Sequence, residues 1–590
     1  KVEGTDAFID AQEAHGVERE ESETEQDDED DIGEEAEAVE VEHDEDGDGN
    51  TGEESDGDAT EDEDAEEEED DEEMKETGGD RPVEDGGPPP EEGGVNGAAV
   101  ALQVSAENAE NAKNSEEAHR PIAAEHGGPP AIDGRGDSSS NQTEHRIGGL
   151  SCKKYGGPSE RIAEEMVYWK DIPTDSELVS PLKQDEATRY MTFEPDGGGW
   201  NNIRMAFETV VSIAHAMGRA LVLPPDQKMY LIGKESFNAN FAHFYHLETL
   251  SKEHAGLTII SMEEFLEQEA MAGHMLDKIS RRPSFPPGNR TNWNGERGQG
   301  MKVLHEWLRN VAHVPQWKPD RCVVAFPSAR GADATSALKE AHKQIKEEVL
   351  HGDADTPVAV DAPIKERMRE ILNGRELCIY NEMMQKEPYI HFVSAHKLGL
   401  RLLVHYYTFL FFEDYRQGLW TKRFVRDHLR YQDELQCAAA RVVHAIKDRA
   451  RKRQWAALGN NSTFASTFMS MHIRRNEFQY KDMFLDAAQL YHASEEELVE
   501  DGTVFVATDE KDRNFFKPLQ EHYDLCFLDD FKHLFEGLNE NLYGMLDQLV
   551  ASRGRRFFGT YYSTFTGFIN RMRGYHADKA RLEGYENGAI

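Results

Sequence analysis

The sequence predicts an α/β protein in which two Rossmann-like lobes face each other across a cleft, behind a disordered acidic tail. Short apolar runs alternate with amphipathic segments over about 400 residues, and glycines or charged residues come where several of those runs end. Strands that alternate with helices in this way form parallel sheets with helices on both faces. Ligands of such sheets bind where the strands end, and two units in series place those ends at a shared cleft.

The tail is predicted from the distribution of charge. Residues 1–150 hold 53 acidic and 8 basic residues, a net charge of −45, whereas residues 151–590 have a net charge of only −6. Acidic runs such as 61–73 repel one another and lack the aliphatic side chains that offset the loss of chain entropy on folding. We expect a solvated spacer or stem over 1–150, with a chaperone-like or calcium-buffering role as the alternative. We expect no nucleic-acid partner.

The first folded unit opens with a strand, a glycine turn, a helix and a second strand. Strands are expected at 190–193 and 220–223, and a helix from Trp200, because its apolar residues recur at helical spacing up to Gly218. Gly197-Gly198-Gly199 lies between the first strand and this helix. Glycines at such a point let the backbone approach an anion at the helix start. An ordinary tight turn is the alternative.

The later elements follow the same reasoning, with a domain boundary expected between 455 and 456. We expect an N-terminal lobe over 151–455 and a C-terminal lobe over 456–590. In the first lobe a strand is predicted at 322–326 and helices at 335–350, 363–372, 398–413 and 423–450. In the second, strands are predicted at 467–473, 503–507, 525–528 and 556–558, and helices at 483–495, 511–519, 538–550 and 563–572.

Three motifs in the second lobe contain residues suited to binding a ligand or to catalysis. Arg474 and Arg475 leave an apolar strand, and an arginine fork at a strand end matches a phosphate, although an ion pair is the alternative. Thr508 and Asp509 follow the next strand, where either could simply cap a helix. Ser563 and the residues after it open the last helix, where hydroxyl and backbone N–H groups suit a phosphate or serve ordinary capping.

The order of these motifs resembles the GDP-fucose protein O-fucosyltransferase family, particularly its plant and protist branch. The resemblance covers roughly residues 150–580. It implies a two-lobed GT-B fold in which the C-terminal lobe, 456–590, binds the nucleotide sugar. It also implies GDP-fucose as donor, no cofactor, no metal requirement and inversion at the anomeric carbon. The stretches that carry it are FEPDGGGWNNIRMAFE, ALVLPP, RTNWNG, KRFVRDHLRY, MHIRRNEFQYK, VFVATDE and SRGRRFFGTYYSTFTGFINRMRGYH.

The resemblance also assigns roles to individual residues. Asn202 matches a family asparagine that is important for catalysis, Arg474 matches the arginine that holds the β-phosphate, and Asp547 has the family spacing of the carboxylate that recognises guanine. Further donor-binding residues are expected at Gly198, Gly199, Trp200, Asn201, His472, Asp509, Ser563, Thr564 and Phe565.

Two departures from the family pattern leave the catalytic base open. Familiar members have Gly-Asp after the two arginines, where this chain has Asn476-Glu477. Some relatives carry a glutamate base three residues before the asparagine, and that position here is Gly199. Glu194 or Asp196 could serve as the base instead, or no side-chain base is used.

We expect the chain to move fucose from GDP-fucose to a hydroxyl of a protein or glycan acceptor. The alternatives are transfer of another deoxysugar, such as rhamnose, to a polysaccharide, and an inactive nucleotide- or glycan-binding member. A Golgi or endoplasmic-reticulum lumen location is expected, with an anchor upstream of Lys1 possible. Five cysteines allow at most two disulfides, and three sequons permit glycosylation, at Asn141, Asn289 and Asn461.

Overall fold

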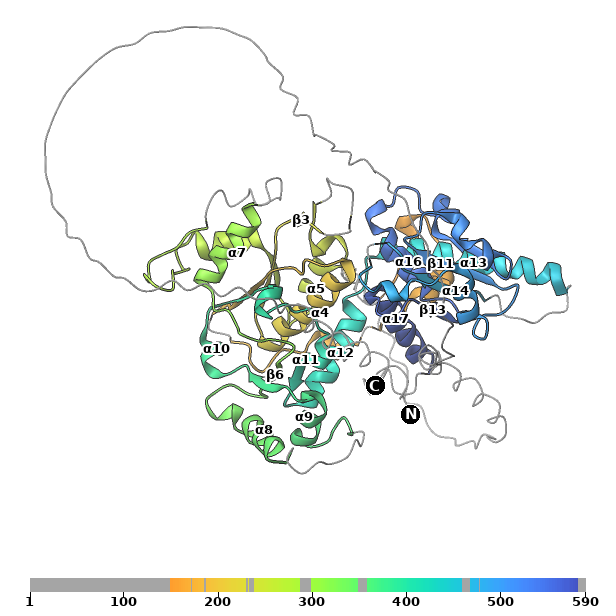
Figure 1. Ribbon diagram of the computed structural model, residues 1–590. Helices are drawn as coiled ribbons and strands as arrows, with labels where there is room; N and C mark the ends of the chain where they lie inside the picture. The colour runs from red at the N-terminus through yellow and green to blue at the C-terminus, as the bar shows by residue number, and fades with distance from the viewer. Residues whose placement is uncertain are drawn as a thin grey trace, which may run out of the picture. The chain divides into compact units, whose positions relative to one another are not determined.

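A computed structural model describes residues 149–581 except 171, 185–186, 230–231, 233–237, 287–298, 349–357, 459–466 and 477. The predicted tail, the three sequons, the RTNWNG motif and Glu477 lie outside the described residues, apart from positions 149 and 150 of the tail. Within the described part, the chain is an α/β protein built on parallel sheets, as predicted (Figure 1).

The first sheet has four parallel strands in the order β5-β2-β1-β8. Their bounds are Ile259–Ser261, Ala220–Leu223, Tyr190–Phe193 and Tyr389–Phe392. Helix α4, Trp200–Met217, connects β1 to β2, and Gly218 ends it in the left-handed conformation at φ 66°. The predicted strand, glycine turn, helix and strand are therefore confirmed.

A second parallel sheet, of order β7-β6-β9, was not predicted as a separate layer. Its strands are β6 Cys322–Phe326, β7 Glu376–Ile379 and β9 Leu410–Phe412. The helix predicted at 398–413 is wrong: only Tyr406–Phe409 is α-helical (α11), and the buried run after it pairs with β6. A short buried strand and a buried helical turn have the same apolar pattern, so periodicity could not separate them.

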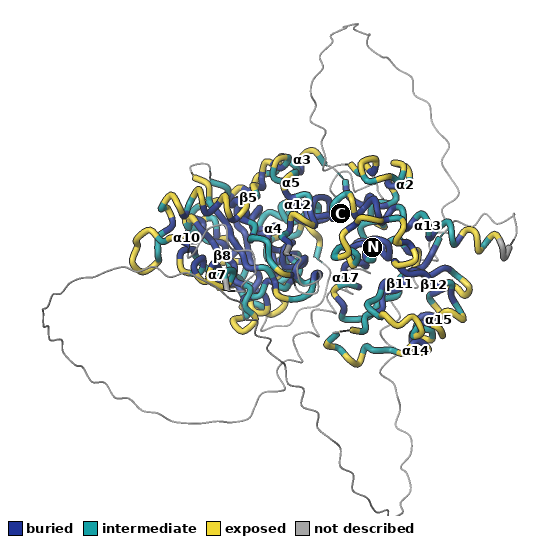
Figure 2. Tube along the Cα trace, turned by 90° about the horizontal axis from the view of Figure 1, so that it is seen from above, coloured by how far each residue is buried: buried dark blue, intermediate teal, exposed yellow. Residues whose placement is uncertain are grey.

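The third sheet confirms the predicted strands of the C-terminal half. It has the parallel order β12-β11-β10-β13, with strands Asp524–Phe527, Thr503–Thr508, Met469–Ile473 and Phe557–Gly559. The helices beside it are α14 Ala487–Ser494, α15 Lys517–Gln520, α16 Tyr543–Ala551 and α17 Thr564–Arg581. Strands β10, β11 and β12 are largely buried (Figure 2), as expected for a sheet with helices on both faces, whereas the edge strand β13 is half-buried.

The helix predicted at 423–450 is two helices, α12 Tyr415–His428 and α13 Asp433–Leu458. The break contains Tyr431, which forms an isolated bridge with Tyr245. Helix α13 contacts elements of the third sheet, since Arg449 pairs with Asp524 at 2.5 Å. The boundary between lobes at 455 remains a prediction.

Two disulfides join distant segments: Cys152 to Cys437, and Cys322 to Cys378 on the adjacent strands β6 and β7. Cys526 is buried and unpaired. The remaining elements are α2 Glu160–Ala163, α3 Pro173–Ser176, β3 Gln227–Lys228, β4 Asn238–Ala239, α5 Leu247–Glu253, α6 Met262–Phe265, α7 Gln299–Val311, α8 Ser336–Glu348, α9 Ile364–Leu372 and α10 Glu382–Lys386, with short 3₁₀ and π turns between them.

Candidate active site

The glycine turn after β1 is held by a buried carboxylate. Asp196 Oδ1 accepts a hydrogen bond from the Gly198 backbone N–H at 2.8 Å, and Arg401 donates to both oxygens of Asp196, at 2.5 and 2.9 Å. A Cβ at Gly198 would lie 2.8 Å from Asn202 Nδ2 and 2.9 Å from Asp196 Oδ1. Glycine is required at this position because no side-chain carbon fits between these two groups.

The turn positions Asn202, the predicted catalytic asparagine, in the first turn of α4. Its Oδ1 accepts a hydrogen bond from Thr564 Oγ1 at 3.0 Å, although the two residues are 362 positions apart. Thr564 is the first residue of α17 and follows β13 by a short loop. The structure thus brings the predicted catalytic residue of the first half against the predicted phosphate-binding segment of the second.

Trp200 and Asn201 face the protein core. Trp200 is buried, its ring lies 4.0 Å from that of Phe244, and its Nε1 donates to the Tyr431 hydroxyl at 2.9 Å. Asn201 Oδ1 accepts from Gln548 Nε2 at 2.8 Å. Their polar atoms thus join α4 to the core and to α16, and a donor-binding role for these two residues stays a prediction.

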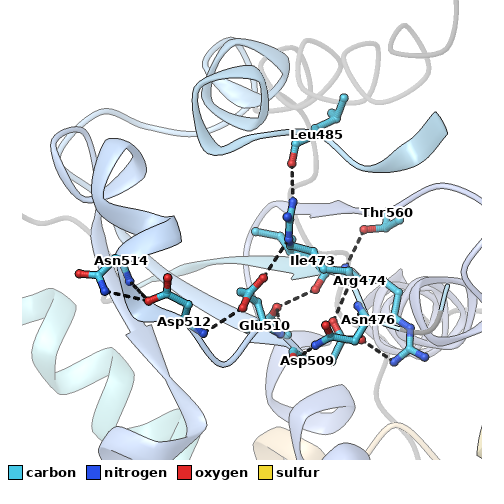
Figure 3. A network of polar contacts seen from close by, with 11 residues as sticks. Ile473, Arg474, Asn476, Leu485, Asp509, Glu510, Asp512, Asn514 and Thr560 are labelled. Carbon is cyan, nitrogen blue, oxygen red and sulfur yellow. Dashed lines mark hydrogen bonds and ion pairs between the residues drawn. The ribbon is translucent and has the colours of Figure 1, made fainter. Parts of the chain in front are cut away.

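Arg474 follows β10 and is oriented by Asp509, which follows β11 (Figure 3). Arg474 Nη1 lies 2.8 Å from Asp509 Oδ2, and its side chain is 25% exposed. The Asp509 carboxylate also accepts from the backbone N–H groups of Arg475 and Asn476, at 2.8 and 3.1 Å. Asp509 thus fixes the whole turn that carries Arg474, which is a more specific role than the helix cap considered from sequence.

Arg475 points to the other side of the strand end, as the alternation of a strand predicts. It pairs with Glu510 at 3.0 Å and donates to the Leu485 carbonyl at 3.0 Å. Its guanidinium lies 4.1 Å from the centre of the Phe515 ring. Arg475 therefore packs on the outer side of the strand end and Arg474 pairs with Asp509 on the other, while the two side chains are similarly exposed, at 27% and 25%.

His472 supports the start of α17 as an uncharged ring. It is buried, its Nδ1 lies 2.7 Å from Thr566 Oγ1, and its ring stacks on Phe565 at 4.4 Å. Burial, and then the nearby Arg474 charge, lower the His472 pKa to about 3. A neutral imidazole adds no positive charge for a phosphate, so these contacts position Phe565 and the α17 start instead. Ser563 is buried directly before this helix.

Asp547, on α16, has a buried carboxylate oxygen without a partner. Its Oδ1 makes no hydrogen bond to any described residue. Burial, and then the negative charge of Asp529, raise the Asp547 pKa well above its ordinary value, while Arg513 lowers it in part. A buried carboxylate left without a donor is costly in the free protein. A ligand that brings N–H donors would remove that cost.

Glu194 and Asp196, the two carboxylates considered as bases, are engaged in ion pairs. Arg309 donates to both oxygens of Glu194 at 2.7 Å, His391 Nε2 lies 3.0 Å from Oε1, and the Ser394 N–H donates to Oε2 at 3.2 Å. Burial raises the pKa of Glu194, but the hydrogen bonds from His391 and Arg309 outweigh it and lower the pKa to about 2. So weak a base is poorly suited to take a proton, and this geometry favours a structural role.

Sequence reasoning missed a buried charge cluster between α4 and α17. Glu208 accepts from Arg204 within α4 and from Arg571 of α17, the latter at 2.9 Å, and the Arg204 guanidinium lies 3.6 Å from the Phe568 ring centre. Removing one member of such a buried cluster is strongly destabilising. The spacing of Arg204 and Glu208, four residues apart on a helix, was the only signal in the sequence.

Among the described residues, no group of three or more His, Cys, Asp or Glu side chains is arranged to hold a metal ion. No described helix is both long enough and apolar enough to span a bilayer.

Parallel sheets with polar and glycine residues at their carboxyl edges are the architecture of nucleotide-binding α/β enzymes. The comparisons with known proteins narrow this class. A family model described as GDP-fucose protein O-fucosyltransferase matches residues 190–576. The chain belongs to this family, and it is a fucosyltransferase that uses GDP-fucose.

Solved structures similar to the chain are distant. The fucosyltransferase NodZ from Bradyrhizobium is 12% identical, with 65% of this chain and 93% of that chain covered and a TM-score of 0.30. POFUT1 in complex with GDP-fucose is 14% identical, with 67% and 96% covered and a TM-score of 0.26. A search of curated proteins gave no match. The assignment of the chain therefore rests on the family model.

Proposed function

We propose that the chain transfers fucose from GDP-fucose to a hydroxyl of a protein or glycan acceptor, with inversion and without a metal ion. The observation that supports this best is the contact between Asn202 and Thr564. It joins the carboxyl edge of the first sheet to the helix start at the carboxyl edge of the third. We propose a two-lobed arrangement around this contact, with the donor on the C-terminal lobe.

Departure of GDP is the step that Arg474 would assist. As the bond between the anomeric carbon and the β-phosphate oxygen breaks, negative charge grows on that oxygen. Arg474 is partly exposed and directed by Asp509, and β10 and β13 are neighbours in register, so Ser563 and the N–H groups of α17 follow the same sheet edge. An arginine and a helix start together suit a diphosphate.

The acceptor hydroxyl would be oriented by Asn202. The oxygen of the acceptor hydroxyl forms a bond to the anomeric carbon on the face opposite the leaving group. The electron pair of the broken bond goes to GDP. Because Glu194 and Asp196 are held in ion pairs, we propose that neither takes the hydroxyl proton. The proton passes instead to the departing diphosphate or to water. The amide of Asn202 then has a positioning role rather than a basic one.

Guanine would be recognised by Asp547. A carboxylate accepts both the N1–H and the N2–H of guanine, whereas adenine offers no such pair of donors. The buried, unpartnered Oδ1 is the feature that supports this role. Binding requires the ionised carboxylate, so GDP affinity should fall as pH drops below the raised pKa of Asp547.

Calorimetry with GDP on wild type and Asp547→Asn tests the assignment. The amide places an N–H against a guanine donor, so we expect GDP binding to weaken by about 2–4 kcal/mol. The variant also replaces a carboxyl group whose Oδ1 is buried and unpartnered, so thermal stability without GDP should stay equal or rise. Equal GDP affinity in the two proteins would move guanine recognition elsewhere, with Asp529→Asn the next variant to measure.

Donor and compartment are tested separately. Product mass after incubation with GDP-fucose, GDP-mannose and UDP-sugars separates fucose transfer from rhamnose-type transfer and from an inactive binder. Two disulfides are typical of proteins that fold in an oxidising compartment, which supports our proposal of a Golgi or endoplasmic-reticulum lumen location. Imaging of the tagged full-length protein checks this.

A further inference from the structure

A basic and aliphatic cleft lies at the carboxyl edge of the first sheet. Its volume is about 310 Å³. It is formed after β8 by Val393 and the turn that follows, and by the loop between α7 and β6. The lining side chains are Arg309, Val314, Gln316, Lys318, Val393, Lys397, Leu398 and Leu400. This volume is at the lower end of the range of ligand sites in proteins.

The cleft is connected to the proposed catalytic turn by hydrogen bonds. Arg309 lines the cleft and holds Glu194, the residue directly after β1. Two positions further on, Asp196 holds Gly198, where an added Cβ would lie 2.8 Å from the Asn202 amide nitrogen. Ion pairs at both Glu194 and Asp196 make this segment rigid. A ligand in the cleft would therefore have a fixed position relative to Asn202.

The charge of the cleft is positive. Its lining contains three cationic side chains and no carboxylate. Glu194 neutralises Arg309, and the nearby Asp320 pairs with Arg321 at 3.5 Å. Lys318 and Lys397 form no ion pair with any residue that the structure describes. Lys318 is half-buried and Lys397 exposed, so an anionic ligand would meet one lysine inside the cleft and one at its rim.

The rest of the lining is aliphatic rather than aromatic. Val314, Val393, Leu398 and Leu400 provide it, and Leu398 is 55% exposed. Sugar-binding surfaces commonly present aromatic rings to the C–H faces of a sugar, and the lining of this cleft has none. Branched aliphatic side chains pack instead against aliphatic side chains of a peptide.

We propose that this cleft is an acceptor-recognition site for a protein segment in which acidic and aliphatic residues are neighbours, close to the hydroxyl that receives fucose. The inference rests on the proposed function, because it uses Asn202 as the point of transfer. Residues assigned to the donor come mainly from the third sheet and its helices, which leaves this edge of the first sheet for the acceptor. Carboxylates of the segment would pair with Lys318 and Lys397, and its aliphatic side chain would contact Leu398.

The test is fluorescence anisotropy on the full chain with GDP present. The probes are a fluorescein-labelled peptide of sequence Gly-Ser-Gly-Leu-Glu-Leu-Glu-Gly, the same peptide with Gln for Glu, and a labelled oligogalacturonate. We expect the acidic peptide to bind at least tenfold more tightly than its Gln counterpart. Lys318→Glu/Lys397→Glu should remove that preference.

The matched control is Lys339→Glu/Lys343→Glu on α8, which changes the net charge by the same amount. We expect this control to change peptide affinity less than twofold. If the double variant at the cleft fails to fold, Lys397→Glu alone decides, since that side chain is exposed.

Three results would overturn the inference: equal binding of the acidic peptide and its Gln counterpart, equal effects of the cleft and control variants, or no binding of either the peptides or the oligogalacturonate. Oligogalacturonate binding that is lost in the cleft variant, without peptide binding, would assign the cleft to acidic glycans instead. GDP calorimetry on the same samples separates the two proposals. If the wild type neither binds GDP nor transfers fucose, the proposed function is refuted. The peptide comparison, in contrast, reports on the cleft alone.

Discussion

Gly198→Ala should impair fucose transfer without unfolding the protein. The added Cβ would lie 2.8 Å from Asn202 Nδ2, 2.9 Å from Asp196 Oδ1 and 3.0 Å from an Arg401 nitrogen. These separations are shorter than any ordinary carbon contact, so at least one neighbour must move. Asp196 is the least able to move, because it is buried and held by two hydrogen bonds from Arg401.

Asn202 is the neighbour that can move, because only its terminal amide meets the new carbon. Rotation of that amide removes the shortest overlap, whereas the separations from Asp196 and Arg401 require a small shift of the turn itself, so the unfolding free energy should fall by about 1–3 kcal/mol, the usual range of overpacking effects. The same rotation breaks the hydrogen bond from Thr564 and displaces the amide by about 1 Å. A displacement of that size in a positioning residue costs roughly 100-fold in rate.

Gly197→Ala is the matched control. A Cβ at Gly197 has no atom within 4 Å, and the backbone there is not left-handed. This variant should keep its transfer rate and its stability. The measurements are kcat/KM with GDP-fucose and chemical denaturation of both variants. The reasoning is refuted if Gly198→Ala keeps more than a third of the wild-type rate, or if the two variants lose activity equally.

Three further predictions concern charge. Arg474→Ala should lower kcat by roughly 100- to 1,000-fold, or about 3–4 kcal/mol, whereas Arg475→Ala should mainly lower stability; similar rates in the two would contradict the phosphate assignment. Glu194→Gln should cost roughly 3 kcal/mol at pH 7, because the folded pKa of about 2 lies below the ordinary value of 4.5. Since a lowered pKa stabilises the fold above the unfolded value, this difference from wild type should shrink as pH falls from 4.5 to 2, and a constant difference in denaturation experiments would exclude it. Transfer should continue in EDTA; loss of activity that manganese or magnesium restores would show a metal requirement.

Periodicity was sufficient for the elements that are both long and regular. Helix α4 and the strands β1, β2, β10 and β11 were predicted because their apolar spacing is unambiguous and glycines or charges mark their ends. The run at 398–413 was not, because a buried strand and a buried helix share one composition. The separate sheet of β6, β7 and β9 depends on pairing between distant segments, which no local pattern encodes.

The site shows the same division. Motif order singled out Asn202 and Thr564, and the fold brings them into contact. Motif order could not distinguish side chains that face the ligand from neighbours that face the core, since Trp200 and Asn201 belong to the same motif as Asn202. Nor could it find partners such as Arg309, His391 and Gln548, which come from distant elements without a motif of their own.

The first turn of α4 explains why one short motif combines both kinds of residue. Successive residues of a helix are rotated by about 100°, so Asn201 and Asn202 face different neighbours. Asn201 is fixed by Gln548 of α16, whose Oε1 in turn accepts from the Tyr431 hydroxyl at 3.0 Å. Asn202, on the adjacent face, meets Thr564 of α17. Asn201, which is buried, fixes the turn, and Asn202, which is more accessible, is positioned by it. This matters because an amide can position a substrate only if its own backbone cannot move.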